Sequence, residues 1–104
     1  KEYYADGHGK DGVPTVNYFA EIVNLTPGYF GDLVKKETGK TAQELISLRI
    51  IEFAKQQLTA TDDDISIVAY DLGFQYPQHF SRMFKRVTGI SPTQFRKQIS
   101  IGYN

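Results

Sequence analysis

Polar side chains suited to hydrogen-bonding a large ligand are concentrated between residues 77 and 87. Apolar residues recur there three and four positions apart, which predicts a helix with one buried stripe, formed by Phe80, Met83, Phe84 and Val87. Gln78 and Arg82 are four residues apart and therefore share the opposite face. A glutamine amide pairs with the edge of adenine and an arginine guanidinium with that of guanine, each through two hydrogen bonds. The spacing therefore favours a helix face that contacts nucleic-acid bases.

Positive charge gathers around the same stretch, although the whole chain is neutral. The 104 residues include 12 Lys and Arg and 12 Asp and Glu. Residues 1–72 hold seven of these cations and all twelve acids, whereas residues 73–104 hold five cations and no acid. The five are Arg82, Lys85, Arg86, Arg96 and Lys97. A basic face of this kind suits a phosphate backbone.

Other chemistries have little support in the sequence. The chain has no Cys, which excludes disulfides and thiolate metal sites. The acidic run 62–64 could bind a cation, but the stronger interpretation is that Asp64 caps the helix that follows. Ser81 and His79 are too few to suggest a nucleophile and its base, and the other histidine, His8, lies in a distant loop. We therefore predict no enzymatic activity, no metal and no cofactor.

The elements that position these side chains are predicted to be helices throughout. No segment alternates with period two, and no apolar run approaches the ~18 residues of a membrane span. We expect an all-α fold of about seven helices, namely the end of a truncated helix in 1–5 and helices over 15–23, 27–38, 42–59, 65–72, 77–87 and 92–98. Caps support these bounds, among them Thr26 before Pro27, Thr41 with Glu44, and Ser91 before Pro92. Phe74, Phe80, Phe84 and Phe95 could stack on bases, but their helical spacing favours core packing.

An internal repeat organises the chain. Residues 20–45 match residues 69–95 at an offset of 49 and then 50, with one residue inserted between Phe74 and Pro77. Each copy has a short helix, a turn residue that tolerates positive φ (Asn24 or Gly73) and a second, capped helix, which together make a helix-turn-helix. The predicted parts are a truncated helix with a loop (1–14), a first unit (15–41), a connecting helix (42–60), a second unit with a closing helix (61–98) and a tail (99–104). A duplicated helical module that binds a protein partner remains the alternative.

The segment 67–96 resembles the C-terminal signature of AraC/XylS-type transcription regulators. The markers are Ala69, Gly73-Phe74, Phe80, Arg82, Phe84-Lys85, Gly89, Ser91-Pro92 and Phe95-Arg96. Residues 20–46 are similar to the first unit of that family, and the helix around Arg49, Ile50 and Ala54 is similar to its connecting helix.

The resemblance implies a domain of a bacterial, cytoplasmic regulator that binds double-stranded DNA in a sequence-specific way, with both recognition helices in successive major grooves. It matches Gln78, Ser81 and Arg82 to base-contacting positions, and it makes His79, Lys85 and Arg86 candidate backbone contacts. An exposed histidine without a contact is the alternative for His79, and Tyr76 either caps its turn or lies on the DNA backbone.

Members of the family usually carry a separate N-terminal domain that binds an effector or dimerises. We therefore expect this piece to be monomeric. RNA polymerase is a further partner expected of the family, with no residue here assigned to it.

The first unit differs from a strong DNA reader. Its corresponding positions are Gly28, Tyr29, Gly31 and Asp32. Glycines offer no side-chain contact but permit close approach of the backbone. The Asp32 carboxylate repels phosphates unless it accepts a hydrogen bond from a cytosine amino group. We therefore expect this unit to bind through its backbone and through Tyr29, Lys35 and Lys36, with little discrimination between bases.

Overall fold

A computed structural model describes residues 12–102, which form helices joined by short turns. Within this range there are six helices and no strand, in agreement with the all-α prediction. They are α2 (Val16–Ile22), α3 (Pro27–Thr38), α4 (Ala42–Ala60), α5 (Ile65–Asp71), α6 (Pro77–Thr88) and α7 (Pro92–Gly102). The additional helix expected in residues 1–5 lies outside the described residues. No described helix is long and apolar enough to cross a membrane.

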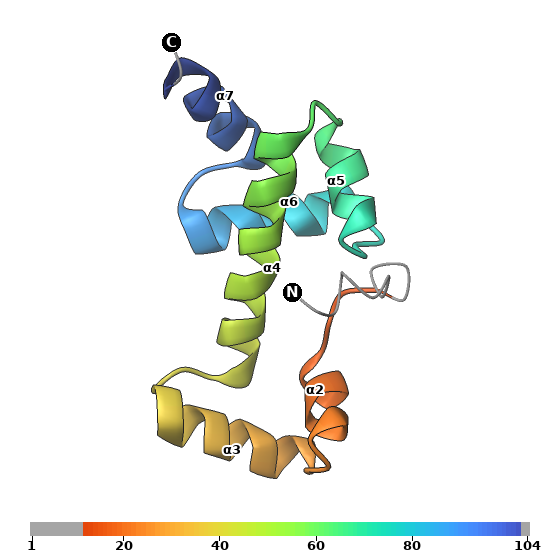
Figure 1. Ribbon diagram of the computed structural model, residues 1–104, viewed down its shortest axis with the longest axis vertical. Coiled ribbons are helices and arrows are strands. Elements are labelled where there is room, and N and C mark those ends of the chain that lie inside the picture. Colours follow the sequence, from red (N-terminus) through yellow and green to blue (C-terminus); the bar gives the residue numbers. More distant parts are fainter. Residues whose placement is uncertain (1–11, 103–104) are drawn as a thin grey trace.

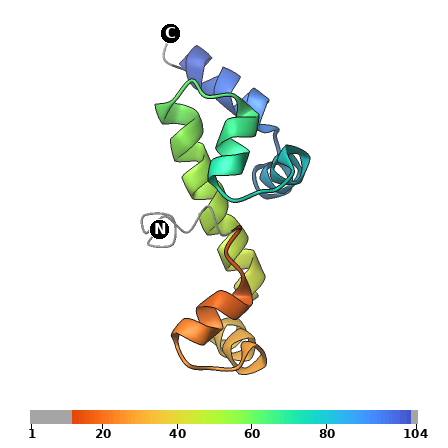
Figure 2. The ribbon, with the colours of Figure 1, turned by 90° about the vertical axis from the view of Figure 1, so that its right-hand side faces the viewer.

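The 19-residue helix α4 connects the two helix-turn-helix units (Figure 1). Thr41 begins it with a complete capping box, in which its hydroxyl accepts from the Glu44 N–H and the Glu44 carboxylate accepts from the Thr41 N–H, both at 3.0 Å. The helices α2 and α3 lie at one end of α4, and α5, α6 and α7 surround the other (Figure 1). Both α3 and α6 are nearly perpendicular to α4 in Figure 1, and both are seen nearly end-on in Figure 2. Their axes are therefore close to parallel.

The two turns repeat one backbone design. Asn24 has φ of 59° and Gly73 has φ of 98°, the left-handed values predicted for these turns. One residue later, the Leu25 N–H donates to Ala20 at 2.9 Å and the Phe74 N–H donates to Ala69 at 3.0 Å. The same bonds hold both helix pairs at the same kind of corner, so the repeat seen in the sequence is a repeat of structure.

The main core lies between α4 and the second unit. Ile50, Ile51, Ala54 and Leu58 of α4 are buried there against α5 and α6. A row of phenylalanine rings continues the core into α7, with centroids 5.5 Å apart for Phe74 and Phe80, 5.9 Å for Phe80 and Phe84, and 5.5 Å for Phe84 and Phe95. These rings pack on one another, which confirms core packing over base stacking.

The apolar residues of the first unit are less buried than those of the second. No residue of α3 is buried, and Leu33 is 38% exposed. Val23 and Leu48 are 52% and 39% exposed. Among the described helices, α3 packs mainly against α2 and α4, whereas α6 packs against α4, α5 and α7, so more of its surface is covered.

Three local predictions are corrected. Arg96 was counted with the basic face, but its guanidinium donates to the carbonyls of Leu58, Thr61 and Asp63, where α4 ends. Asp64 stands at the N-cap position of α5, but its side chain makes no capping hydrogen bond. The last helix continues to Gly102 instead of ending at residue 98, because no Gly or Pro interrupts it before Gly102.

Candidate nucleic-acid interface

The packing of α6 decides which of its side chains reach solvent. Phe80 and Phe84 are completely buried on one side of the helix. Phe80 is held between Phe74 and Phe84, so α6 is fixed in rotation about its own axis. Gly89, with φ of 89°, ends the helix, and its N–H donates to the Lys85 carbonyl at 2.7 Å. The opposite face is therefore presented by a rigid element.

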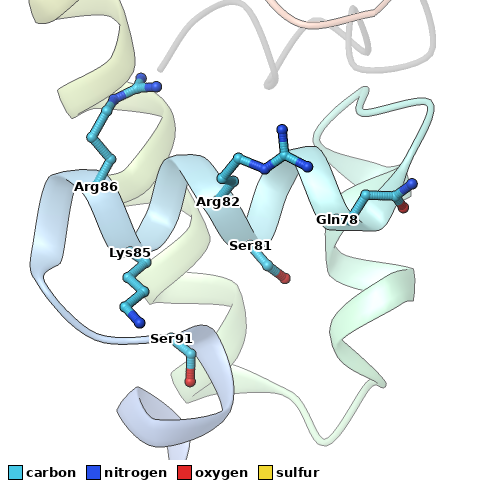
Figure 3. A pocket seen from close by; sticks show the side chains of 6 residues that line it. All are labelled: Gln78, Ser81, Arg82, Lys85, Arg86 and Ser91. Atoms are coloured by element: carbon cyan, nitrogen blue, oxygen red, sulfur yellow. The ribbon is translucent and has the colours of Figure 1, made fainter.

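The exposed face of α6 borders a shallow, open hollow of about 530 Å³. The residues that line it are Gln78, Ser81, Arg82, Lys85, Arg86 and Ser91. Figure 3 shows that five of them follow one another along α6 and that Ser91 joins them from the start of α7. All three side chains predicted to contact bases lie in the N-terminal half of this row, and two of the predicted backbone contacts, Lys85 and Arg86, lie in its C-terminal half.

The cations in this hollow are not paired with acidic side chains in the part of the chain that the structure describes. Within the described residues, Arg82, Lys85 and Arg86 make no ion pair and no side-chain hydrogen bond, which sets them apart from Arg49, paired with Glu52 at 3.4 Å. Lys85 and Arg86 stand in the last turn of α6, where the helix dipole favours positive charge. The hollow is therefore a concentrated positive surface open to an anionic partner.

An aromatic pair flanks the beginning of α6. The rings of Tyr76 and His79 meet edge to face, with centroids 5.4 Å apart. Tyr76 occupies the N-cap position, but its side chain makes no capping bond and is 48% exposed. Of its two predicted roles, capping the turn is therefore not seen. Both rings are exposed and flank Gln78 in the sequence, but neither lines the hollow.

The corresponding face of α3 is built from different side chains. Thr26 caps α3 by accepting from the Tyr29 N–H at 3.2 Å, and Tyr29 is 58% exposed. A Cβ added at Gly28 or Gly31 would meet no atom within 4 Å, so the fold does not require either glycine. Asp32 is exposed among them. The residues of α3 that were predicted to face DNA are therefore exposed. They provide few hydrogen-bond donors, and one of them is a carboxylate.

Glu44, which was predicted only as a capping residue, adds a second carboxylate near the cationic end of α3. Its pKa is lowered chiefly by the hydrogen bonds from Thr41, and the positive charges of Lys35 and Lys40 lower it further. The repeat places Gln94 at the matching position of the second unit, where its neutral amide oxygen accepts from the Ser91 N–H at 2.9 Å. The same capping geometry is therefore charged in one unit and neutral in the other.

Ser91 is a residue of the hollow that the sequence analysis missed. The Ser91-Pro92 cap was recognised as the beginning of a helix, and the Ser91 hydroxyl does accept from the Gln94 N–H at 3.1 Å. Its place beside Lys85 depends on how α7 packs against α6, which no local signal reveals.

The described part of the chain brings together no group of three or more His, Cys, Asp or Glu side chains able to hold a metal ion. His79 and Ser81 are two residues apart on α6 and so point to different sides of the helix. The side chains that line the hollow are an amide, two hydroxyls and three cations.

Comparison with known proteins agrees with this architecture. A family described as a helix-turn-helix domain matches residues 19–98. Among curated proteins, the chain is 34% identical over 85 residues to the uncharacterised helix-turn-helix transcriptional regulator YobQ of Bacillus subtilis, and this match covers 82% of the chain and 35% of YobQ. It is 31% identical over 87 residues to the raffinose operon regulatory protein RafR of Pediococcus pentosaceus, over 84% of the chain and 31% of RafR. The chain thus spans about a third of the length of these relatives.

Solved structures give the same result. The C-terminal domain of the response regulator AraT from Geobacillus stearothermophilus superposes with a TM-score of 0.79 at 28% identity, covering 93% of this chain and 79% of that one. The C-terminal domain of the two-component response regulator yesN from Fusobacterium nucleatum superposes with a TM-score of 0.77 at 25% identity, covering 91% of each chain.

Proposed function

This chain belongs to the AraC-type helix-turn-helix family, as the DNA-binding domain of a transcription regulator, and we propose that the second unit carries most of its sequence-specific binding. The observation that supports this proposal is the hollow on α6, where Gln78 and Arg82 stand on a rigid, exposed face and make no side-chain hydrogen bond or ion pair within residues 12–102. Side chains near the N-terminus of a recognition helix reach base edges when the helix lies in the major groove. In this proposal Gln78, Ser81 and Arg82 contact bases.

Phosphate contacts supply the affinity that does not depend on sequence. Lys85 and Arg86 follow the base-contacting residues along α6 and line the hollow, and the exposed His79 belongs to the first turn of α6. In this proposal these three residues contact phosphates near the two ends of α6. Each phosphate neutralised releases counterions, so binding weakens steeply as salt rises.

The first unit positions the domain on DNA more than it discriminates between base sequences. Since α3 and α6 run nearly parallel and α4 holds them apart, the two helices can enter successive major grooves (Figures 1 and 2). Gly28 and Gly31 leave the surface of α3 free for close approach, while Tyr29, Lys35 and Lys36 are exposed for contacts with the DNA backbone. This unit therefore aligns the domain on DNA with few demands on sequence.

The remaining functions of the whole protein are proposed from the family. We expect an effector-binding or dimerising domain elsewhere, contact with RNA polymerase, location in the cytoplasm, and no catalysis by this domain. The separation of His79 from Ser81 on α6 supports the last point, since the two side chains point to different sides of the helix.

Selection from a random duplex library tests the proposed function. The domain is incubated with the library at two salt concentrations, and the retained DNA is sequenced. We expect an enriched motif, weaker retention at the higher salt, and loss of part of the motif for Arg82→Ala. Lys97→Ala removes the same charge from an exposed position on α7 outside the hollow and serves as the control. Retention without a motif, or retention independent of salt, would instead indicate a module that binds a protein partner.

A further inference from the structure

We infer that Gln78 and Arg82 act as a two-base reader, which selects an adenine and a guanine at neighbouring base pairs, about one or two steps apart. The inference depends on the proposed function, because it assumes that α6 lies in the major groove. It names the sequence that this groove must contain, and it assigns one base to each of two side chains.

The spacing of the two residues fits neighbouring base pairs. Gln78 and Arg82 extend from successive turns on the same face of α6 (Figure 3). Four residues of α-helix advance roughly 6 Å, at 1.5 Å per residue. A helix in the major groove is inclined to the DNA axis, so residues three or four positions apart on it meet base pairs about one or two steps apart. Gln78, closer to the N-terminus, therefore meets one base pair, and Arg82 meets a neighbouring one.

The chemistry of each side chain selects one base. The Gln78 amide offers a donor and an acceptor side by side, which matches N7 and the N6 amino group of adenine. The Arg82 guanidinium offers two parallel donors, which match O6 and N7 of guanine. Neither side chain makes a hydrogen bond within the described residues, so both are available to DNA without breaking a contact.

The other groups in the hollow do not add a comparable code. The Ser81 hydroxyl is both donor and acceptor, and it accommodates several bases. Lys85 and Arg86 are in the last turn of α6, and Lys85 extends toward Ser91 and away from Gln78 (Figure 3). A straight helix leaves the curved groove toward its end, where cations meet phosphates. The structure therefore leaves two discriminating positions on this helix.

Rigid support makes such a code possible. Phe80 lies between the two readers in the sequence, is completely buried, and packs against Phe74 and Phe84. Because the backbone of α6 is fixed by this packing, each reader starts from a defined position relative to the groove.

The test compares the motifs selected by the wild-type domain and by three variants. We expect Gln78→Ala to lose the preference for adenine at one position and Arg82→Ala to lose the preference for guanine at a second position, about one or two base pairs away. Each loss should reduce discrimination against the wrong base by about 5- to 150-fold. Gln78→Glu should change the preference at its position from adenine to cytosine, because a carboxylate accepts from the cytosine amino group. A merely structural role for Gln78 would not produce that exchange.

The matched control is Gln98→Ala, which removes the same amide from an exposed position on α7 outside the hollow and should keep both positions of the motif. Thermal unfolding checks that each variant is folded, as expected for changes at the exposed Gln78 and Arg82. The inference is overturned if the wild type selects a motif in which these variants alter the same position, positions far apart, or none. Absence of any motif for the wild type overturns both this inference and the proposed function, so the two failures are distinguishable.

Discussion

The two helix-turn-helix units share one backbone plan but differ in burial and in charge. In the second unit α6 buries Phe80 and Phe84 and presents a face of cations, whereas in the first unit α3 buries no residue and presents Asp32 beside two glycines. The turn hydrogen bonds and the left-handed residues of both units are nevertheless equivalent. The fold of a duplicated unit can therefore persist while its binding surface diverges, because different atoms serve the two purposes.

Removal of a core ring should have the largest effect, and the size should differ between units. We expect Phe84→Ala to lower the free energy of unfolding by about 3–5 kcal/mol, since a fully buried ring leaves a cavity. Phe30→Ala should cost about 1–2 kcal/mol, because Phe30 is only half-buried in α3. Urea denaturation followed by circular dichroism measures both. Equal losses would show that the two units are packed equally well and would contradict the deeper packing of the second unit.

A methyl group added at Gly31 of α3 should change the stability of the domain and its affinity for DNA in opposite directions. Gly31→Ala should raise the free energy of unfolding by about 0.5–1 kcal/mol, because alanine is a better helix former and its Cβ meets no atom within 4 Å. The same variant should bind DNA more weakly if the α3 backbone approaches the groove closely, as proposed. Thermal unfolding and a binding titration on the selected duplex give the two values. A more stable variant with unchanged affinity would exclude close approach at Gly31.

The smallest expected effect concerns the charge of the first capping box. Glu44→Gln keeps the cap, because glutamine also serves in a capping box, and it makes the first unit resemble the second, with its Gln94. Loss of a carboxylate near Lys35 should tighten DNA binding about two- to fivefold at low salt.

The pKa of Glu44 is lowered, so its carboxylate is charged throughout the neutral and mildly acidic range, and the gain should be the same at pH 6 and pH 8. Titrations at both pH values, with Glu52→Gln as the control on the same helix, check this. A gain that appears equally in the control would indicate a general charge effect.

Local signals in the sequence were sufficient for most of the fold. The caps at Thr26, Thr41 and Ser91, together with the turn residues Asn24 and Gly73, lie within a few residues of the bonds they form, and the helices begin and end near the predicted bounds. The row of side chains along α6 followed from helical periodicity, because a buried stripe determines the face opposite to it.

Features that depend on distant contacts were not predictable in this way. Arg96 bonds to carbonyls 33 to 38 residues earlier in the chain, so its sequence position gave no indication of that role. The exposure of Leu33 has a similar origin, because periodicity shows which side is apolar but not whether anything covers it. Ser91 reaches the hollow only through the packing of α7 on α6.

The central claim is that the second unit supplies the discrimination between sequences, and one comparison tests it directly. Binding constants of the wild type, Arg82→Ala, Tyr29→Ala and Asp32→Ala are measured by fluorescence anisotropy on the selected duplex and on a scrambled duplex at the same salt concentration. We expect Arg82→Ala to lower the ratio of the two affinities by about 5- to 150-fold. Tyr29→Ala and Asp32→Ala should change both affinities together and keep the ratio. If either of them lowered the ratio as far as Arg82→Ala, the first unit would read the sequence as well, and the proposed division between the units would be wrong.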